Sequence, residues 1–269
     1  MNAFVHHLSY DFRTGLRDRS LLLLNYLFPL FFYVMMGLIM TQINPTFTQT
    51  MVPAMVTFAI LSSALLGLPN PIVSARENGI YRSFKINGVP ALSILVIPVL
   101  GILAHILVVS GIITLTAQPL FDAPLPTQWV ANWLLVILTG LSMAGIGLLI
   151  GVVAPHSRSV VFLSQAIYLP SMILGGLMMP VEILPKAMGR IALLLPSTHA
   201  MNAFRGLAMG LSTSIDPLVS VAALAAGAVI TFVLAVYLFE WDDRQARRRP
   251  ALLALLGLLP FALTAIFFG

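Results

Sequence analysis

The chain has 269 residues, of which 59% are hydrophobic and 9% are charged, with a formal net charge of +5. Soluble domains carry about 25% charged residues, so this composition excludes an ordinary water-soluble globule and predicts an all-α integral membrane protein in a lipid bilayer. The basic residues flank apolar stretches instead of forming one patch, which argues against nucleic acid as a partner, and the absence of cysteine excludes disulfides and cysteine-ligated zinc.

Residues 1–20 predict an amphipathic helix that lies at the membrane interface. Phe4, Leu8, Phe12 and Leu16 recur at every fourth position, which places them on one helical face. An apolar face with charged residues elsewhere on the helix is typical of a segment that lies among the lipid headgroups. A solvated leader whose spacing arises by chance is the alternative.

Seven uncharged segments that follow are long enough to cross a bilayer, which requires about 20 apolar residues in a helix. They are Leu21–Thr41, Met51–Ser74, Ala91–Ala117, Trp129–Ala154, Val160–Met179, Leu218–Phe239 and Ala251–Phe268. The first is longer than a secretory signal core and has no cleavage pattern after it, so we expect it to stay in the membrane. The last is the shortest, so residues 241–269 are predicted to form a basic linker followed by a seventh span or a re-entrant segment.

Lysine and arginine residues predict the orientation of these spans. With the N-terminus in the cytoplasm, eleven of the 14 fall on the cytoplasmic side. Only Lys186, Arg190 and Arg205 fall on the other side. Cytoplasmic loops of membrane proteins are enriched in these residues, so we expect a multi-pass protein of a cell membrane, such as a bacterial inner membrane, with a cytoplasmic N-terminus.

Residues 76–85 form a charged island between the second and third apolar segments. Charge is costly inside a bilayer, so residues 75–90 should form a loop in water at the cytoplasmic face. Ile80, Phe84 and Val89 supply apolar side chains within it. A short amphipathic helix with such side chains can dock into a groove of a soluble protein. A charged loop that only fixes the topology is the alternative.

The motifs of a nucleotide-hydrolysing or metal-dependent enzyme are absent from the sequence. A phosphate-binding loop needs G-x-x-x-x-G-K-[ST], but the only lysines, Lys85 and Lys186, follow Phe84 and Pro185. The five histidines do not follow a metal-ligand spacing such as H-E-x-x-H. We therefore expect a protein that is not an enzyme and that holds no cofactor or metal within this chain.

Prolines interrupt the segment between the fifth and sixth spans, residues 180–206. This segment is too broken to span and too apolar for open water, so we expect short helices that dip into the outer leaflet. Irregular backbone at that depth must pack on protein or face a watery cavity. Glu182, Lys186 and Arg190 follow one another at intervals of four, which predicts that they share one helical face.

Two sequence patterns resemble those of ABC transporter type-2 permeases, the membrane subunits of many exporters. The outer signature of this family is matched by Pro180, Glu182, Pro185, Pro196, Arg205 and Gly206. The Arg-Glu-x-Gly element of its cytoplasmic loop is matched by residues 76–79, and the resemblance covers about residues 4–240. The chain departs from the family pattern in its C-terminal span and at Thr198-His199-Ala200, where the family has an aromatic residue.

The resemblance implies six transmembrane helices in each of two permease subunits, identical or related. It also implies a coupling helix at residues 75–90 that rests on a separate cytoplasmic ATP-binding subunit. ATP and Mg would bind to that partner, and ATP hydrolysis there would drive export. The default substrate is hydrophobic or amphipathic and drug-like, and lipid-linked glycans and sodium are the alternatives. The implied coupling residues are Arg76, Glu77, Gly79, Tyr81, Phe84 and Lys85. In these roles Glu77 anchors the loop, Gly79 allows a tight turn and Phe84 makes an apolar contact.

The route of the substrate is less defined. The family resemblance places the contact between the two permeases near the first and fifth spans. His105, Met172 and Met178 are candidates for the substrate path, since methionines give adaptable apolar walls and ionisable residues within spans are rare. Ordinary packing of the methionines and an interhelical hydrogen bond of His105 are the alternatives.

Two other classes of function stay open at this point. A secondary transporter driven by an ion gradient would need buried carboxylates, and no Asp or Glu lies within the seven segments. A membrane scaffold or a membrane-embedded enzyme is the other class, and the enzyme would need a polar catalytic cluster at one face. A neighbouring reading frame for a P-loop ATPase would favour the exporter.

Overall fold

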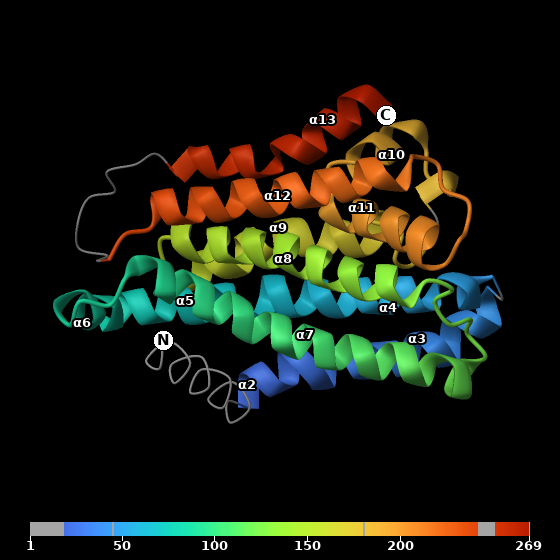
Figure 1. Cartoon of the computed structure of the whole chain (residues 1–269), viewed down its shortest axis with the longest axis horizontal. Helices are drawn as coiled ribbons and strands as arrows, with labels where there is room; N and C mark the ends of the chain where they lie inside the picture. The colour runs from blue at the N-terminus through green and yellow to red at the C-terminus, as the bar shows by residue number, and fades with distance from the viewer. Residues whose placement is uncertain (1–18, 45, 180, 242–250, 269) are drawn as a thin grey trace.

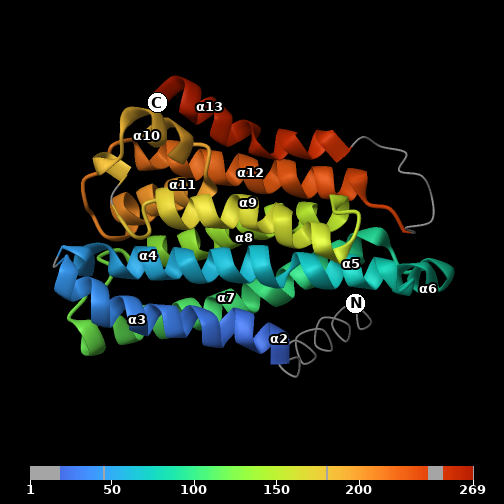
Figure 2. The same cartoon turned by 180° about the vertical axis from the view of Figure 1, so that it is seen from behind.

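A computed structural model of the protein describes residues 19–44, 46–179, 181–241 and 251–268. The predicted interfacial helix at residues 1–20 falls almost wholly outside them, and so does most of the basic linker. The described residues are mainly helical and contain no strand. Their long helices lie side by side in one bundle, as the composition predicts (Figure 1, Figure 2).

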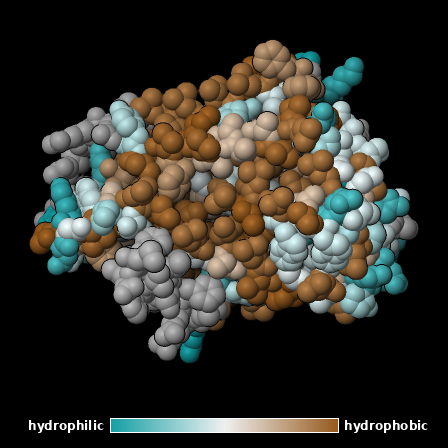
Figure 3. All heavy atoms as spheres, viewed as in Figure 1, coloured by the Kyte–Doolittle hydropathy of each residue, from teal (hydrophilic) through white to brown (hydrophobic). Residues whose placement is uncertain are grey.

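Five helices of the described part are long and apolar enough to cross a membrane. They are Arg19–Ile43, Phe47–Glu77, Ala91–Phe121, Trp129–Val153 and Pro217–Leu238. Each corresponds to one of the seven predicted segments. Figure 3 shows a surface that is apolar across the middle of the bundle and more hydrophilic towards its two ends, which suits a protein that spans a bilayer.

The first two spans each contain a π-helical turn shortly before a proline. The first is built from α2 (Arg19–Leu22), η1 (Leu23–Leu27) and α3 (Phe28–Ile43), and the second from α4 (Phe47–Ser62), η2 (Ser63–Gly67) and α5 (Pro69–Glu77). Proline lacks an N–H, and its ring clashes with the carbonyl four residues earlier. The wider turns before Pro29 and Pro69 relieve that contact without breaking the helix. The second span is almost entirely buried and forms the centre of the bundle.

The fifth predicted segment, Val160–Met179, is observed as α9 (Ser157–Leu174), which is not among the five long apolar helices. Ser164, Tyr168 and Ser171 are buried in the bundle, whereas Phe162 is 77% exposed. These inward-facing polar residues lower the mean hydropathy of α9. Its outer face nevertheless presents apolar side chains such as Phe162. The number of spans stays a prediction.

The close approach of α8 (Trp129–Val153) to the second span depends on a glycine. A Cβ atom on Gly147 would lie 2.1 Å from the carbonyl oxygen of Ala64 in η2. Any side chain at this position must therefore push the two helices apart. Small residues at helix contacts allow this kind of close packing within membranes.

Replacing Gly147 by alanine should destabilise the bundle by about 1–3 kcal/mol, the usual cost of overpacking, even though alanine is the better helix former. Thermal unfolding of the purified protein in detergent measures this effect. Gly189→Ala is the matched control in α10 (Lys186–Ala192), because nothing lies within 4 Å of a Cβ built there. Equal unfolding temperatures for the two variants would contradict the close contact.

The C-terminal segment packs along α12 (Pro217–Leu238) as η5 (Ala251–Leu258) and α13 (Leu259–Phe268) (Figure 1, Figure 2). A 3-10 helix rises about 2.0 Å per residue and an α-helix about 1.5 Å, so the segment reaches roughly 31 Å, close to the thickness of the hydrocarbon core. Phe261 is fully buried against Gly227 of α12, whereas Phe267 is exposed. The segment is shorter than the five long apolar helices, and the extra span stays a prediction.

Candidate functional site

The predicted coupling loop and the predicted outer segment lie at opposite ends of the bundle. The short helix α6 (Ile80–Ile86) follows α5 at one end. At the other end are η3 (Val181–Ile183), α10 and α11 (Pro196–Ala203) (Figure 1). This arrangement is the one expected if the two segments face opposite sides of a membrane.

Arg76 binds the C-terminal end of α8 from the last turn of α5. Its side chain is buried, with 6% exposure, and its guanidinium donates to the carbonyl oxygens of Val152 at 2.7 Å, Gly151 at 3.5 Å and Ala154. The last carbonyls of a helix have no partner within the helix and carry partial negative charge. Arg76 therefore supplies both the missing hydrogen bonds and the favourable charge.

Glu77 binds the N-terminal end of α9. Its carboxylate accepts hydrogen bonds from the backbone N–H of Ser157 at 3.1 Å and from the Ser157 hydroxyl at 2.7 Å. The first N–H groups of a helix lack partners and favour an anion, and His156, at the N-cap of α9, makes no side-chain capping bond. Glu77 therefore caps α9 from a different helix. We call Arg76, Glu77 and their partners at residues 151–157 the α5–α8–α9 clamp.

Two glycines with positive φ bound α6. Gly79 has φ 71° and Gly88 has φ 72°, a left-handed conformation that favours glycine. The chain turns sharply at Gly79 between α5 and α6. Tyr81 is buried, and its ring lies 5.5 Å from the ring of Phe239, just beyond the end of α12. The short helix is therefore held in a fixed position on the bundle.

The predicted coupling residues divide into an inner and an outer group. Arg76 and Tyr81 are buried, and Phe84 is half-buried against the core. Lys85 is exposed, and so is Ile86, whose side chain is 79% accessible. The prediction that Phe84 is the outward apolar contact is untested, but Ile86 is the more exposed apolar residue and was missed. The spacing of Tyr81 and Phe84 could have revealed the exposure of Ile86, because Tyr81 and Phe84 lie on one face of the helix and Ile86 lies on another.

The outer signature is only partly described. Pro180 and the side chain of Glu182 lie outside the described part of the chain. The predicted common face of Glu182, Lys186 and Arg190 is wrong, because Pro185 is extended at ψ 145° and separates η3 from α10. Lys186 and Arg190 alone share α10.

The remaining signature residues shape the helices that follow. Pro196 is the first residue of α11, a position where its missing N–H costs nothing. Arg205 and Gly206 lie in η4 (Phe204–Ala208). A Cβ atom on Gly206 would lie 2.2 Å from the ring of Pro217, so this position requires glycine for close contact with the start of α12.

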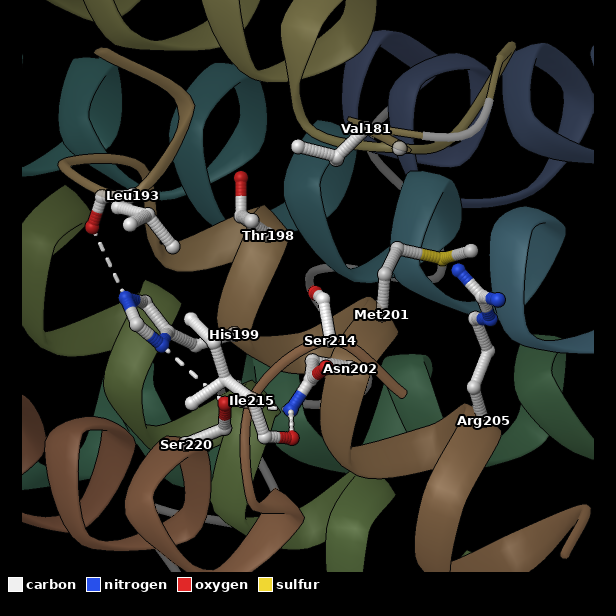
Figure 4. Close-up of a pocket in the computed structure, with 11 residues that line it drawn as sticks. Val181, Leu193, Thr198, His199, Met201, Asn202, Arg205, Ser214, Ile215 and Ser220 are labelled. Carbon is white, nitrogen blue, oxygen red and sulfur yellow. Dashed lines mark hydrogen bonds between the residues drawn. The ribbon is translucent and has the colours of Figure 1, made fainter. Parts of the chain in front are cut away.

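His199, which the sequence marked only as a departure from the family pattern, joins three helices at the outer end. Its Nε2 lies 2.9 Å from the carbonyl oxygen of Leu193 and 3.0 Å from the hydroxyl of Thr264 in α13. Its Nδ1 lies 3.3 Å from the hydroxyl of Ser220 in α12, and Asn202 donates to the same hydroxyl at 3.0 Å (Figure 4). The two departures from the family pattern, at His199 and in the C-terminal segment, are therefore in contact.

Acidification should destabilise the folded protein through the buried His199 at the outer end. Burial lowers the pKa of His199, which outweighs the opposite effect of the Leu193 carbonyl, so the unfolded chain binds a proton at a pH where the folded protein does not. Stability should be complete above the ordinary histidine value near pH 6.5 and should fall as the pH drops below it. Unfolding temperatures in detergent between pH 5 and pH 8 measure this, with His199→Gln as a non-titrating control. The same pH slope in both proteins would contradict the prediction.

The three candidates for the substrate path lie in different surroundings. His105 is buried in α7 (Ala91–Phe121), and its Nδ1 is hydrogen-bonded to the hydroxyl of Tyr26 at 2.6 Å. Met172 packs against the core. Met178 borders a cavity of about 150 Å³ at the outer end. In the described residues no group of three His, Cys, Asp or Glu side chains could hold a metal ion.

Comparison with known proteins identifies similar membrane transport proteins. A family model described as ABC-2 type transporter matches residues 3–209. Nodulation protein J of Rhizobium meliloti (strain 1021) is 29% identical over 121 residues, which cover 42% of this chain and 44% of that protein. ABC transporter G family member 20 of Dictyostelium discoideum is 29% identical over 168 residues, 61% of this chain and 22% of that protein.

A third relative aligns over a larger share of both chains. The putative transport permease YvfS of Bacillus subtilis (strain 168) is 23% identical over 203 residues, 74% of this chain and 82% of that protein. By contrast, the alignments span less than half the length of the nodulation protein and of the Dictyostelium transporter. No solved structure matches the chain.

Proposed function

Because the chain belongs to the ABC-2 type transporter family, we propose that it is the permease subunit of an ATP-driven exporter that moves a hydrophobic or amphipathic substrate out of the cell. It is a multi-pass membrane protein and a component of a transporter. The observation that carries the proposal is the clamp: Arg76 and Glu77, in the last turn of α5 shortly before α6, are hydrogen-bonded to the ends of two further helices. Such connections allow a soluble partner that binds α6 to move several helices of the bundle together.

In this proposal a cytoplasmic ATP-binding subunit holds ATP and Mg and contacts the exposed side of α6. Ile86 offers it an apolar contact and Lys85 a positive charge. A displacement of α6 then reaches α8 and α9 together, because Arg76 holds the end of one and Glu77 the start of the other. Rigid elements with fixed hydrogen bonds can transmit such a movement across the membrane.

A second permease subunit, identical or related, completes the proposed transporter. The exposed apolar side chains of the first span and of α9, such as Phe31 and Phe162, support the placement of the dimer contact near these helices. The proposed orientation places α6 and the N-terminus in the cytoplasm, in agreement with the distribution of Lys and Arg.

Co-expression with the ATP-binding protein of a neighbouring reading frame tests the proposed function. We expect the two proteins to purify together and candidate amphipathic substrates to stimulate ATP hydrolysis. Transport into liposomes by this chain alone, driven by an ion gradient, would contradict the proposal and favour a secondary transporter. Failure of every neighbouring or co-transcribed ATPase to bind in membranes would also contradict it.

A further inference from the structure

The C-terminal segment, residues 251–268, ends beside the short outer helices. Its η5 and α13 run along α12, and the end of α13 lies near α10 (Figure 1, Figure 2). The matching family model covers residues 3–209, so this segment lies outside the part of the chain that it describes. The contacts that the segment makes with the bundle indicate what it does.

Two close contacts seat the segment on α12. The ring of Phe261 is fully buried over Gly227, and a Cβ atom on that glycine would lie 2.7 Å from the ring. Gly257 of η5 lies over Thr231, whose methyl group would be 2.9 Å from a Cβ atom at residue 257. Small residues allow helices to approach this closely in a membrane. The segment is therefore fixed along α12 at two levels.

A chain of hydrogen bonds joins the end of the segment to the outer helices. The Leu193 carbonyl can only accept, so the Nε2 of His199 carries a proton, which it shares between that carbonyl and the Thr264 hydroxyl. The Nδ1 of the neutral ring then accepts from the Ser220 hydroxyl. The Thr264 hydroxyl donates its own proton to the Phe261 carbonyl at 2.7 Å. Every donor in this chain has an acceptor, so the contact between α13 and α11 is specific.

The same contact lies where α10 is attached to the bundle. Ala192, in the last turn of α10, is fully buried, whereas Met188 is 46% exposed. The Ala192 carbonyl accepts from the Thr198 hydroxyl at 2.6 Å, and the next carbonyl, that of Leu193, accepts from His199. The C-terminal segment therefore meets the outer helices at the point that holds α10 in place.

We propose that residues 251–268 form a strap that holds α10 and α11 against the outer end of the bundle. Phe261 anchors the strap on α12, and Thr264 attaches it to His199. Tertiary contacts of this kind raise the free energy of local opening, so the strap sets how readily the outer helices move away. In the proposed exporter, on which this consequence rests, opening of the outer end requires the Thr264–His199 contact to break. The strap itself acts without an ATP-binding partner, so it is tested separately from the proposed function.

A cysteine at position 192 measures the opening. The chain has no cysteine, so Ala192→Cys places a unique thiol in the buried last turn of α10. The full chain in phosphatidylcholine nanodiscs should react slowly with a maleimide, and Thr264→Val should raise the rate about fivefold, the effect of losing one hydrogen bond. His199 keeps the Leu193 carbonyl as an acceptor in this variant, so its N–H is not left without a partner. Thr114→Val, which removes a buried hydroxyl from α7, is the matched control and should leave the rate unchanged.

Hydrogen exchange repeats the test without the introduced thiol. In Thr264→Val the amides of residues 186–200 should exchange faster, and those of the α5–α8–α9 clamp at the other end should not. Phe261→Ala removes the anchor and should have the larger effect, and if that variant does not fold, Thr264→Val alone decides. Equal rates in Thr264→Val and Thr114→Val would overturn the strap. Faster exchange throughout the bundle would overturn it as well, because a general loss of stability would then explain the labelling.

Discussion

Replacing Arg76 by methionine should destabilise the folded protein by about 3 kcal/mol and should lower partner-driven transport more than tenfold. The variant leaves the last carbonyls of α8, at Val152 and Ala154, without their donor. Each buried polar group that loses its partner costs about 1–3 kcal/mol. Methionine keeps much of the volume of the side chain, so the loss reports on the hydrogen bonds and the charge. Arg76→Lys should recover only part of it, because an ammonium cannot match the fork of a guanidinium.

Arg158→Met is the matched control for this experiment. Arg158 is an exposed arginine at the same end of the bundle, in the first turn of α9. Its removal should change the free energy of unfolding by less than about 1 kcal/mol, as is usual for surface charges. Unfolding in detergent measures stability, and reconstituted vesicles with the ATP-binding partner measure transport. Equal losses in the two variants would show that Arg76 has no special role.

Gly79→Pro should insert normally into the membrane and abolish transport, together with substrate-stimulated ATP hydrolysis. Proline fixes φ near −65° and cannot adopt the φ of 71° at this turn, so α6 must leave its place beside Phe239. Nothing lies within 4 Å of a Cβ built on Gly79, so a side-chain clash does not contribute; proline does remove the N–H that donates to the Arg76 carbonyl at 3.0 Å, which alanine and asparagine keep.

Two graded variants control this prediction. Alanine in the left-handed conformation costs roughly 1–2 kcal/mol, so Gly79→Ala should be impaired but active. Asparagine visits this conformation readily, so Gly79→Asn should transport at close to the normal rate. Substrate-stimulated ATP hydrolysis by the reconstituted complex gives the ranking. Full activity of the proline variant would show that the direction of α6 does not matter for coupling.

Hydropathy predicted most of the fold because the lipid imposes it. Long uncharged segments must form helices in a bilayer, and five of the seven predicted segments are observed with the expected length and composition. The second span was predicted to end at Ser74, but it continues through Arg76 and Glu77. The charge of these two side chains suggested a loop in water. Their partners on α8 and α9 allow the helix to include them instead.

Contacts between distant segments could not be predicted from spacing. Glu77 and Ser157 are 80 residues apart, and His199 and Thr264 are 65 apart. No local pattern connects them, because the packing of whole helices brings them together. The prediction that Glu182, Lys186 and Arg190 share one helical face was wrong for a local reason, because it assumed one continuous helix across Pro185. Proline separates the 3-10 turn from α10 and ends that register.

The two ends of the bundle also differ in what their sequences disclose. The Arg-Glu-x-Gly element at residues 76–79 drew attention to Arg76 and Glu77 as coupling residues by family resemblance, but not to their partners on α8 and α9. The cavity that Met178 borders had no such signal, because its walls come from the loop after α3, the segment after α9 and η4. Each wall alone reads as an ordinary outer loop. The three are brought together only by the tertiary fold.

Labelling of Ile86→Cys most directly tests the central claim that an ATP-binding partner moves this bundle through α6. The chain has no cysteine, so the introduced thiol is unique, and Ile86 is 79% exposed. Thr46→Cys, exposed at the opposite end, is the control. We predict that a membrane-impermeant maleimide labels Thr46→Cys on intact cells but labels Ile86→Cys only in inside-out vesicles, where a bifunctional reagent also crosslinks it to the ATP-binding subunit. Labelling of Ile86→Cys on intact cells, or its failure to crosslink in the active complex, would contradict the account.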